Sequence, residues 1–210
     1  MNTLLGVLPK EEFAEMVQHL KVRQNWQLYK SALTKEMCET IISNFSKLEA
    51  FDGTTFAGST GNVAVANNST RKSKVRWVHN EPHLVELLLH FVHEANDRAF
   101  NVDIYHEMPE MQFTEYQASY GGKYDWHHDV NWVNDKNYDR KLSMVVQLSE
   151  PDAYEGGIFQ FNEVENPIAE DWMQQGSILI FPSYLRHRVT EVTKGVRYSL
   201  VSWVRGPRWR

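Results

Sequence analysis

The 210-residue sequence lacks the features that mark several classes of protein. It has one cysteine, Cys38, so an internal disulfide is excluded and nothing indicates adaptation to an oxidising compartment. Its apolar runs all fall short of the ~20 residues that a membrane-spanning helix needs. The formal net charge of −5 gives no overall attraction to nucleic acid or to an anionic membrane. Internal repeats and low-complexity tracts are absent as well.

The N-terminal stretch MNTLLGVLPKEEF does not resemble a signal peptide, since its apolar run is short, no basic segment precedes it and Pro9 comes early. We therefore expect a cytoplasmic protein that does not associate with membranes. Hydrophobic residues make up 42% of the chain and charged residues 23%, as in ordinary globular proteins. A chain of this length fits one structural domain with a substantial core.

The N-terminal part of the sequence predicts two helices. The first begins near Pro9, with glutamates in its early turns, where carboxylates suit the positive end of a helix. The second follows Thr34 as its N-cap, and Cys38 lies among its apolar positions, so we expect this thiol to pack in the core. Those apolar positions are Met37, Ile41, Ile42, Phe45 and Leu48.

A third helix is expected to open at Asn80, with Pro82 in its first turn. Its apolar face consists of Leu84, Leu87, Leu88, Phe91, Val92 and Ala95. Two pairs of histidines lie on or beside it, His79 with His83 and His90 with His93. The spacing within each pair suits a metal, but neither pair has a third ligand. We therefore favour solvated helix positions for all four.

The second half of the sequence is rich in strand patterns. From about residue 111 the hydrophobic period becomes two, most clearly at Leu142, Met144, Val146 and Leu148. Residues 177–181 form a short apolar run and residues 196–204 a further strand. Turn signals separate the runs at Gly121-Gly122, Pro151-Asp152, Gly156-Gly157, Asn166-Pro167 and Gly176. Short strands that follow helices predict an α+β fold with an antiparallel jelly-roll core and helices packed outside.

The most informative motif is Tyr124-Asp-Trp-His127-His128-Asp129. Residues two apart on a strand project to the same face, so His127 and Asp129 point together while His128 points away. One imidazole and one carboxylate are two of the three ligands of a facial triad, which leaves positions open for substrate and oxygen as non-haem iron requires. Taken alone the motif is a weak signal, and two exposed polar residues at a strand end are the alternative.

Two later residues strengthen this interpretation. His187 stands at the start of a strand among apolar neighbours, in FPSYLRHRV. Arg197 and Ser199 lie on one face of the next strand, together with Val201 and Trp203, so we expect both to point into the interior that holds the metal. No acid is placed on that face to pair with the guanidinium, and a dicarboxylate ligand satisfies it through a bidentate contact. Without the histidines, an exposed strand arginine is the alternative.

In order and spacing, these motifs resemble the prolyl-4-hydroxylase-like branch of the 2-oxoglutarate/iron(II) dioxygenases, including its short bacterial and bacteriophage members. The matching pieces are Tyr124-x-x-His127-x-Asp129, Arg140-Lys-Leu-Ser143, Tyr154-Glu-Gly-Gly157-x-Phe159, Phe181-Pro-Ser183 with His187, and Gly195-x-Arg197-x-Ser199-x-x-x-Trp203. The resemblance covers about residues 110–205. A weaker match, Arg71-Lys-Ser73-x-x-x-Trp77 with the helix after Thr34, extends it through the first half.

The resemblance implies a double-stranded β-helix core over residues 106–206, with a helical and loop part, residues 1–105, packed on it in one structural domain. It makes His127, Asp129 and His187 the iron ligands. The implied cofactors are Fe(II), 2-oxoglutarate and O2, with ascorbate as a candidate accessory reductant.

The same resemblance assigns residues to the cosubstrate. Arg197 binds the C5 carboxylate of 2-oxoglutarate, and Ser199 on the same strand face contributes to its site. Tyr116 resembles a cosubstrate-binding tyrosine on the strand before the iron motif, although this chain has one extra residue between that tyrosine and His127. Gln147 stands where several prolyl hydroxylases place a second cosubstrate-binding tyrosine.

The implied activity is oxidative decarboxylation of 2-oxoglutarate to succinate and carbon dioxide, coupled to hydroxylation of a C–H bond in a peptidyl proline. A protein or peptide is then the partner, and the oligomeric state stays open. The presence of Asp129 argues against halogenation, which needs that coordination position for chloride. The alternatives are the same chemistry on a small molecule or on alkylated nucleic acid, a zinc hydrolase, and a metal-free barrel that only binds. Nucleic acid is disfavoured because Trp203 replaces a second arginine typical of the demethylases.

Several features suit a peptide groove. Residues 52–70, rich in Gly, Asn, Ser and Thr, predict a long loop with one short strand at most, and loops of this length are often functional. Trp132 and Tyr138, in the loop after the iron motif, are candidates for stacking on a proline ring. The basic residues Arg71, Lys74 and Arg76 are expected at the rim. The alternative is that all of these residues simply solvate loops.

Overall fold

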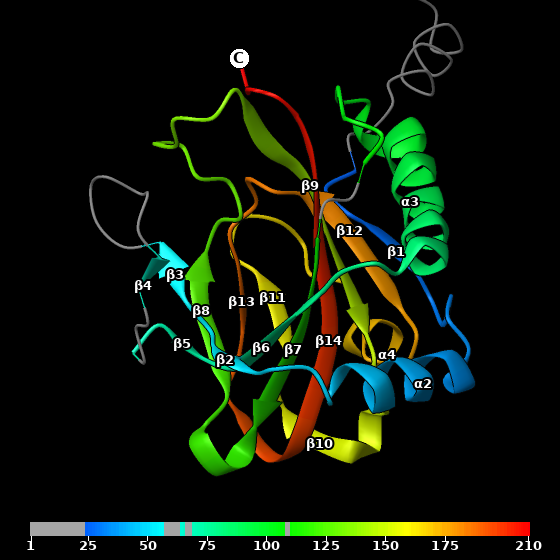
Figure 1. Cartoon of the computed structure of the whole chain (residues 1–210), viewed down its shortest axis with the longest axis vertical. Helices are drawn as coiled ribbons and strands as arrows, with labels where there is room; N and C mark the ends of the chain where they lie inside the picture. Colours follow the sequence, from blue (N-terminus) through cyan, green and yellow to red (C-terminus); the bar gives the residue numbers. More distant parts are fainter. Residues whose placement is uncertain (1–23, 57–63, 66–68, 108–109) are drawn as a thin grey trace, which may run out of the picture.

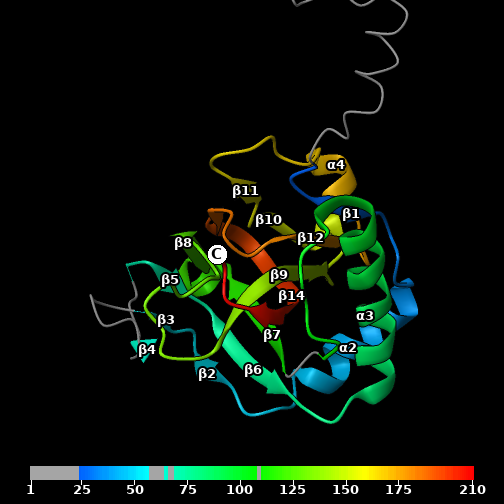
Figure 2. The same ribbon diagram turned by 90° about the horizontal axis from the view of Figure 1, so that it is seen from above.

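The computed structural model describes residues 24–56, 64–65, 69–107 and 110–210. In this part of the chain two antiparallel sheets face each other, and helices α2 and α3 cover the outer face of the larger sheet (Figures 1 and 2). This is the α+β jelly-roll arrangement that the strand patterns predict. The helix expected near Pro9 lies outside the described residues. None of the described helices is both long and apolar enough to cross a membrane.

The larger sheet holds most of the strands. Its order is β1 (Gln27–Tyr29), β12 (Ile178–Pro182), β9 (Tyr138–Gln147), β14 (Val192–Pro207), β7 (Met111–Gln117), β6 (Lys74–Val78) and β2 (Phe51–Asp52), and β10 (Tyr154–Gly156) pairs with β14. The smaller sheet has the order β11 (Phe159–Phe161), β13 (His187–Val189), β8 (Lys123–His127) and β5 (Arg71–Lys72). Short helical turns connect them: η2 (Ala118–Tyr120), η3 (Pro151–Ala153) and α4 (Ala169–Trp172).

Alternation along the strands divides the core into two layers. Met144 and Val146 on β9 pack toward the helices, whereas Val145 between them packs toward the smaller sheet. Burial is complete or nearly so for Leu142, Met144, Val146 and Leu148. The period-two pattern therefore predicted the strand, and the structure shows that its apolar side faces the helices. The layer between the two sheets also contains the polar cavity described below.

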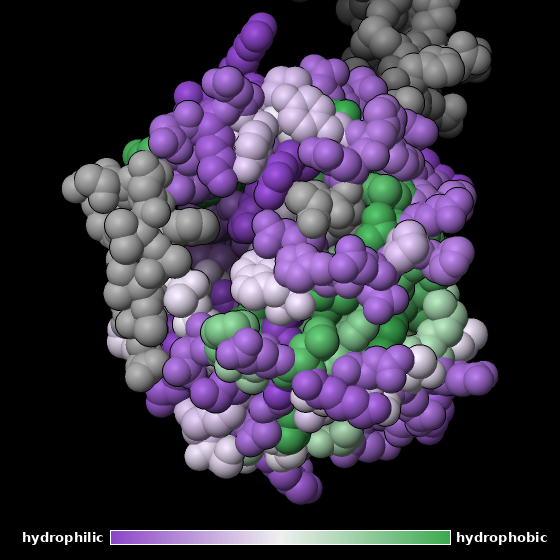
Figure 3. Space-filling view, in the orientation of Figure 1, coloured by the Kyte–Doolittle hydropathy of each residue, from purple (hydrophilic) through white to green (hydrophobic). Residues whose placement is uncertain are grey.

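The helices begin and end close to the expected residues. Thr34 Oγ1 accepts a hydrogen bond from the Met37 N–H, which caps α2 (Lys35–Phe45), and Cys38 is fully buried as expected. Leu48, expected on the same apolar face, lies beyond the end of this helix and is 40% exposed. Apolar residues on the face shown in Figure 3 gather on the side of α2 and α3.

The helix expected at Asn80 begins slightly later. α3 (Pro82–Ala95) has Glu81 at its N-cap, and Asn80 adopts a left-handed conformation with φ of 61°. A proline at the first helical position suits the helix start because its missing N–H has no partner there anyway. The helix continues into a π-helical turn, η1 (Asn96–Phe100).

The strands of the N-terminal half were not predicted from the sequence. β1 pairs with β12, β6 pairs with β7, and β5 pairs with β8, so this half completes the edges of both sheets. The expectation of one short strand at most in residues 52–70 is wrong, since β3 (Thr55–Phe56) pairs with β4 (Ala64–Val65) and β2 ends at Asp52. Segments of two residues are too short to show a period, and their pairing partners decide their conformation.

Candidate metal centre and adjoining cavity

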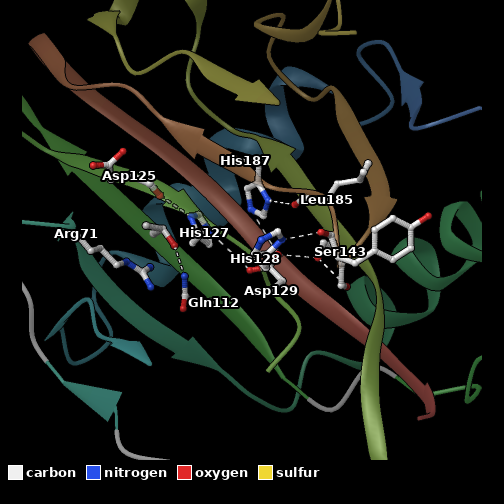
Figure 4. Close-up of polar contacts among 12 residues, drawn as sticks. Arg71, Gln112, Asp125, His127, His128, Asp129, Ser143, Leu185 and His187 are labelled. Atoms are coloured by element: carbon white, nitrogen blue, oxygen red, sulfur yellow. Dashed lines mark hydrogen bonds and ion pairs between the residues drawn. The ribbon is translucent and has the colours of Figure 1, made fainter. Parts of the chain in front are cut away.

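Three predicted ligands converge at one end of the smaller sheet (Figure 4). His187 begins β13 and lies opposite His127, the last residue of β8, and Asp129 follows two residues later. Nε2 of His127 is 3.7 Å from Asp129 Oδ1, and Nε2 of His187 is 3.6 Å from Asp129 Oδ2. Within the described ranges this is the one group of three His, Cys, Asp or Glu side chains with ligand atoms close enough for a metal, all within 4.8 Å of one another.

Backbone carbonyls fix the tautomer of both imidazoles. Nδ1 of His127 donates to the Asp125 carbonyl at 2.8 Å, and Nδ1 of His187 donates to the Leu185 carbonyl at 2.9 Å. Because a carbonyl only accepts, each Nδ1 carries a proton, and in the neutral ring each Nε2 is then the atom that presents a lone pair to the site. Burial lowers the pKa of His127 well below 6.5, and the neighbouring His187 lowers it further. The His127 ring is therefore neutral and able to coordinate at neutral pH.

Asp129 is buried but stays ionised. Burial by itself raises the pKa of its carboxyl group, but His187, His127 and the guanidinium of Arg140 favour the charged form. The Ser143 hydroxyl also donates a 2.6 Å hydrogen bond to Oδ2, and these influences together hold the pKa at about 2. Ser143 in turn contacts the Ser183 hydroxyl at 2.9 Å. The carboxylate is thus charged and held in one orientation before any ligand binds.

This donor set fits a divalent ion of the iron type. Two neutral imidazole nitrogens and one carboxylate oxygen on one side of an ion leave several coordination positions open, the arrangement of non-haem iron oxygenases. Ligand atoms bound at about 2.1 Å and at right angles lie about 3 Å apart. The imidazole nitrogens lie 3.7 Å from Asp129 Oδ1 and 3.6 Å from Oδ2, somewhat more than this value, and all three ligand atoms lie within 4.8 Å of one another.

A cavity of about 200 Å³ adjoins the three ligands and is walled by both sheets. A recess on the hydrophilic side of the molecule is visible in Figure 3. The cavity is bordered by Gln112, Tyr116, Arg140, Arg197, Ser199 and Trp203 of the larger sheet, and by Arg71, Tyr124, Phe159 and Val189 of the smaller one. Three of these side chains are guanidinium groups, whereas Asp129 is the one carboxylate on its wall.

Arg197 is the cavity group that most clearly lacks a partner. Its side chain is 1% exposed, and its Nε donates to Gln147 Oε1 at 3.1 Å. Nothing among the residues that the structure describes accepts a hydrogen bond from its buried Nη2. A buried charged donor without an acceptor is costly, so the site is built to receive an anion there.

Gln147 has a different place from the one expected. A guanidinium only donates, so the amide oxygen of Gln147 must face Arg197. Its Nε2 then donates to the Tyr154 hydroxyl at 2.9 Å and to the Ser149 carbonyl at 3.0 Å. Both amide hydrogens are used within the protein, and Gln147 does not border the cavity. It orients the arginine from behind instead of reaching a cosubstrate.

Tyr116 and Ser199 do border the cavity beside Arg197. Tyr116 is the ladder partner of Arg197 between β7 and β14, and its ring centre is 5.7 Å from the guanidinium carbon. Ser199 is 1% exposed on the same face of β14. Gly157, with φ of +59°, approaches so closely that an added Cβ would lie 2.9 Å from Arg197 Cδ. The structure therefore places Arg197, Tyr116 and Ser199 on the cavity wall and Gln147 in contact with Arg197 but off that wall.

Some cavity residues received no individual role from the sequence. The Tyr124 ring stacks on His127 with centroids 3.5 Å apart, and the Arg71 guanidinium lies 4.4 Å from the Tyr124 ring centre. Arg140 lies 3.7 Å from the Trp203 ring centre. Their positions within the matched motifs were the available signal, but the motifs alone do not reveal which side chains touch.

The three basic residues expected at the rim lie in three different surroundings. Arg76 forms a largely buried pair with Glu115, at 3.1 Å, so its expected place at the rim is wrong. Lys74 is partly exposed and pairs with Asp52. Arg71 is buried in the cavity wall. Strand alternation places Arg76 beside Phe113, on the helix-facing side of the sheet.

Other histidines lie outside the cluster. His128 is exposed and donates from Nδ1 to the Tyr184 carbonyl at 2.7 Å, and it also borders the cavity although the sequence pattern placed it on the opposite strand face. His93 contacts His106 with nitrogens 3.4 Å apart, without a third ligand group in the part of the chain described. The solvated interpretation of the α3 histidines is consistent with this.

Known proteins resemble this chain in sequence. The model of the 2OG-Fe(II) oxygenase superfamily matches residues 111–205. A PKHD-type hydroxylase of Parvibaculum lavamentivorans is 38% identical over 87 residues, which are 40% of this chain and 37% of that protein. One from Rippkaea orientalis is 25% identical over 178 residues, 82% of this chain and 74% of the relative. The chain spans less than two fifths of the length of the first curated relatives it matches, 37% and 39%.

Solved structures share the fold at low sequence identity. A Pseudomonas putida prolyl-4-hydroxylase has a TM-score of 0.66 at 17% identity, covering 93% of this chain and 98% of its own. A viral collagen prolyl hydroxylase from Paramecium Bursaria Chlorella virus-1, solved with 2OG, has a TM-score of 0.64 at 18% identity, covering 87% and 97%. A Trichoplax adhaerens prolyl hydroxylase in complex with a peptide fragment has a TM-score of 0.65 at 17% identity, covering 92% and 89%.

Proposed function

Because residues 111–205 match the model of the 2OG-Fe(II) oxygenase superfamily, we propose that the chain is an Fe(II)- and 2-oxoglutarate-dependent dioxygenase that hydroxylates a C–H bond. His127, Asp129 and His187 are the proposed iron ligands. The observation that carries the proposal is the buried Arg197, whose Nη2 lacks an acceptor in a cavity that adjoins this triad. A dicarboxylate that spans the cavity binds the metal with one end and accepts hydrogen bonds from the Arg197 guanidinium with the other.

The protein's own residues bind and orient the cosubstrate. Arg197 takes the distal carboxylate of 2-oxoglutarate, Gln147 holds the guanidinium in place, and Tyr116 and Ser199 border the same space. Bound Fe(II) supplies the oxidising chemistry, in which 2-oxoglutarate and O2 become succinate and carbon dioxide while one oxygen atom enters a substrate C–H bond. Ascorbate is expected to help keep the iron reduced.

We assign residues 106–206 to the catalytic core and residues 1–105 to a part that packs on it within one structural domain. Support comes from the shared hydrophobic cluster of α2, α3 and the larger sheet. We place the reaction in the cytoplasm, because reducing conditions suit both Fe(II) and the free thiol of Cys38.

A peptidyl proline is the proposed substrate. Several similar structures are prolyl hydroxylases, one of them bound to a peptide. In this chain a second hollow of about 490 Å³ shares Trp77, Asp129 and Arg140 with the metal cavity and extends to Tyr138. An extended ligand lying in this hollow has access to the metal. Trp132, 54% exposed in the adjoining loop, offers an aromatic face at the surface.

The alternative substrates and the alternative functions have less support. Phosphate recognition needs free cations, but Lys74 pairs with Asp52, Arg76 with Glu115 and Arg205 with Glu110, the last at 3.4 Å. A zinc hydrolase leaves the buried guanidinium of Arg197 unexplained. A metal-free binding module leaves unexplained why two imidazoles present their lone pairs to one carboxylate. A small molecule fits the cavity itself but does not use the second hollow.

The experiment that tests this function incubates the protein with Fe(II), ascorbate and 2-oxoglutarate and measures succinate. Proline-containing peptide libraries are added, and mass spectrometry looks for one added oxygen on proline. His187→Ala and Arg197→Ala serve as matched inactive controls. Succinate release that is stimulated by free amino acids or methylated oligonucleotides, and by no peptide, contradicts the proline assignment. No 2-oxoglutarate turnover with any substrate, in protein that binds Fe(II), contradicts the oxygenase assignment.

A further inference from the structure

The residues after β14 fold back over the start of β9, where Figure 1 shows the red C-terminal segment beside the first residues of that strand. The Trp209 backbone N–H donates to Asp139 Oδ2 at 2.8 Å, and its indole Nε1 donates to the Arg140 carbonyl at 3.3 Å. Arg208 Nη2 donates to the Asn134 carbonyl at 3.2 Å. One short segment is therefore tied both to β9 and to the loop before it.

The Trp209 ring makes two further contacts. The Lys141 ammonium lies 3.8 Å from its centroid, and the Tyr184 ring meets it edge-on at 5.2 Å. Lys141 is 5% exposed, and burial lowers its pKa. An ammonium taken out of water gains from an aromatic face more than an exposed one does. The ring thus links β9 with the turn that contains Tyr184.

Both partners of the ring belong to segments whose backbone holds the proposed metal ligands. The Lys141 carbonyl accepts a hydrogen bond from the Ser183 N–H at 2.9 Å, and the Ser183 carbonyl accepts from the Asp129 N–H at 3.0 Å. Two residues further along, the Leu185 carbonyl holds Nδ1 of His187. The turn at residues 183–186 therefore supports two of the three proposed ligands, and β9 carries Arg140 into the cavity.

We propose that Trp209 is a positioning residue, whose ring holds the start of β9 against the turn at residues 183–186 as a clamp. In this way it sets the width of the cavity where it meets the second hollow, the proposed substrate site. Its ring contacts carry this role, because the indole hydrogen bond of 3.3 Å is longer than usual. The ladder between β8 and β13 positions His127 and His187, and the backbone hydrogen bonds of Ser183 to Asp129 and Lys141 do not involve the ring. Arg197 lies on β14 away from these contacts. Metal and cosubstrate binding should therefore depend little on the clamp.

Amide hydrogen exchange of the full chain, with Mn(II) and 2-oxoglutarate bound, tests the clamp without any substrate. Trp209→Ala should speed amide hydrogen exchange about tenfold in residues 131–140 and in residues 183–186. The exchange rates of α2 and β12 should stay unchanged. Trp209→Phe keeps the ring and should stay within about threefold of the wild type. The matched control is Trp26→Ala, which removes an indole that donates to the Glu165 carbonyl. It should leave both segments unchanged.

A second variant covers the case in which Trp209→Ala does not fold. Tyr184→Leu removes the edge-on ring and should speed exchange in residues 131–140, although it lies outside them. Unchanged exchange in that segment, or a Trp209→Phe variant that behaves like Trp209→Ala, overturns the proposal. Faster exchange throughout the chain also overturns it, since that indicates general destabilisation.

The catalytic meaning of the clamp rests on the proposed function, and kinetics test it separately. With the proline peptide found in the library assay, Trp209→Ala should raise the peptide KM about tenfold, with kcat and the 2-oxoglutarate KM within twofold, and Trp209→Phe should restore the peptide KM. Equal changes in all three parameters contradict a positioning role. If no peptide is turned over by the wild type while the exchange result holds, the substrate assignment fails and the clamp stands.

Discussion

His187 lies directly opposite His127 in the ladder between β13 and β8, and their ring centroids are 4.2 Å apart. Far apart in the chain, these residues become neighbours through strand pairing alone. A slip of one residue in this register would turn His187 to the other face and break the cluster. Asp129, just past the end of β8, completes the group from the same end of the sheet.

Loss of any proposed ligand should abolish metal binding. We expect His127→Ala, Asp129→Ala and His187→Ala each to lower Mn(II) affinity on the order of 100-fold or more and to stop conversion of 2-oxoglutarate to succinate, because too few ligands remain on one side of the ion. The control is His128→Ala, which should change the affinity less than threefold. A variant at His128 that fails while the one at His127 works would mean that the strand faces are reversed.

The hydroxyl of Ser143 should matter for the metal although it is no ligand. It orients Asp129 through a 2.6 Å hydrogen bond, and such supporting contacts typically contribute about 10- to 100-fold in metal affinity or activity. We therefore expect Ser143→Ala to weaken Mn(II) binding by about that factor, as measured by calorimetry. Ser183→Ala, one contact further from the metal, is the matched control and should have the smaller effect. Equal affinities for Ser143→Ala and the wild type would count against this role.

Removal of the Arg197 guanidinium should weaken the binding of 2-oxoglutarate and leave metal binding unchanged. Loss of one partner of a buried charge pair costs about 2–5 kcal/mol. This corresponds to a 2-oxoglutarate affinity lower by roughly 30- to 3,000-fold. Titration of Mn(II)-loaded Arg197→Ala with 2-oxoglutarate measures it, and Mn(II) affinity in the same variant serves as the control. An unchanged cosubstrate affinity would remove Arg197 from the site.

Gln147 should act through Arg197. Gln147→Ala removes the acceptor for Arg197 Nε and frees the guanidinium to turn, so the 2-oxoglutarate affinity should fall, but by less than in Arg197→Ala. In the double variant the change at Gln147 should add almost nothing, because the group that it orients is gone. Fully additive effects, measured by the same titration, would instead indicate an independent contact between Gln147 and the cosubstrate.

The Cys38 thiol should be nearly inert in the folded chain. Burial, with a smaller effect of the Glu39 carboxylate, raises its pKa from 9.0 to about 11. A raised pKa means less thiolate, the reactive form, so alkylation by iodoacetamide at pH 8 should be on the order of 100-fold slower than in the urea-unfolded chain. The rate should rise about tenfold per pH unit up to about pH 11. Equal rates for folded and unfolded chains would show that the thiol is accessible.

The sequence by itself determined the parts of this protein that depend on local pattern. Alternation at Leu142, Met144 and Val146 identifies a strand with one apolar side, because successive side chains on a strand point to opposite faces. The same rule brings His127 and Asp129 together, and Thr34 marks the start of α2 because its hydroxyl caps a free backbone N–H.

Tertiary structure decided whatever depends on a partner far away in the chain. β5 and β6 gain their strand conformation from pairing with β8 and β7, which residues of so short a segment do not specify. Gln147 turns away from the cavity because the Tyr154 hydroxyl and the Ser149 carbonyl use both of its amide hydrogens. The Trp209 ring packs on Lys141 and Tyr184, which come from two different segments of the chain. A hydrogen-bond donor or a ring face goes to whichever group the folded chain brings within reach, and local sequence does not contain that information.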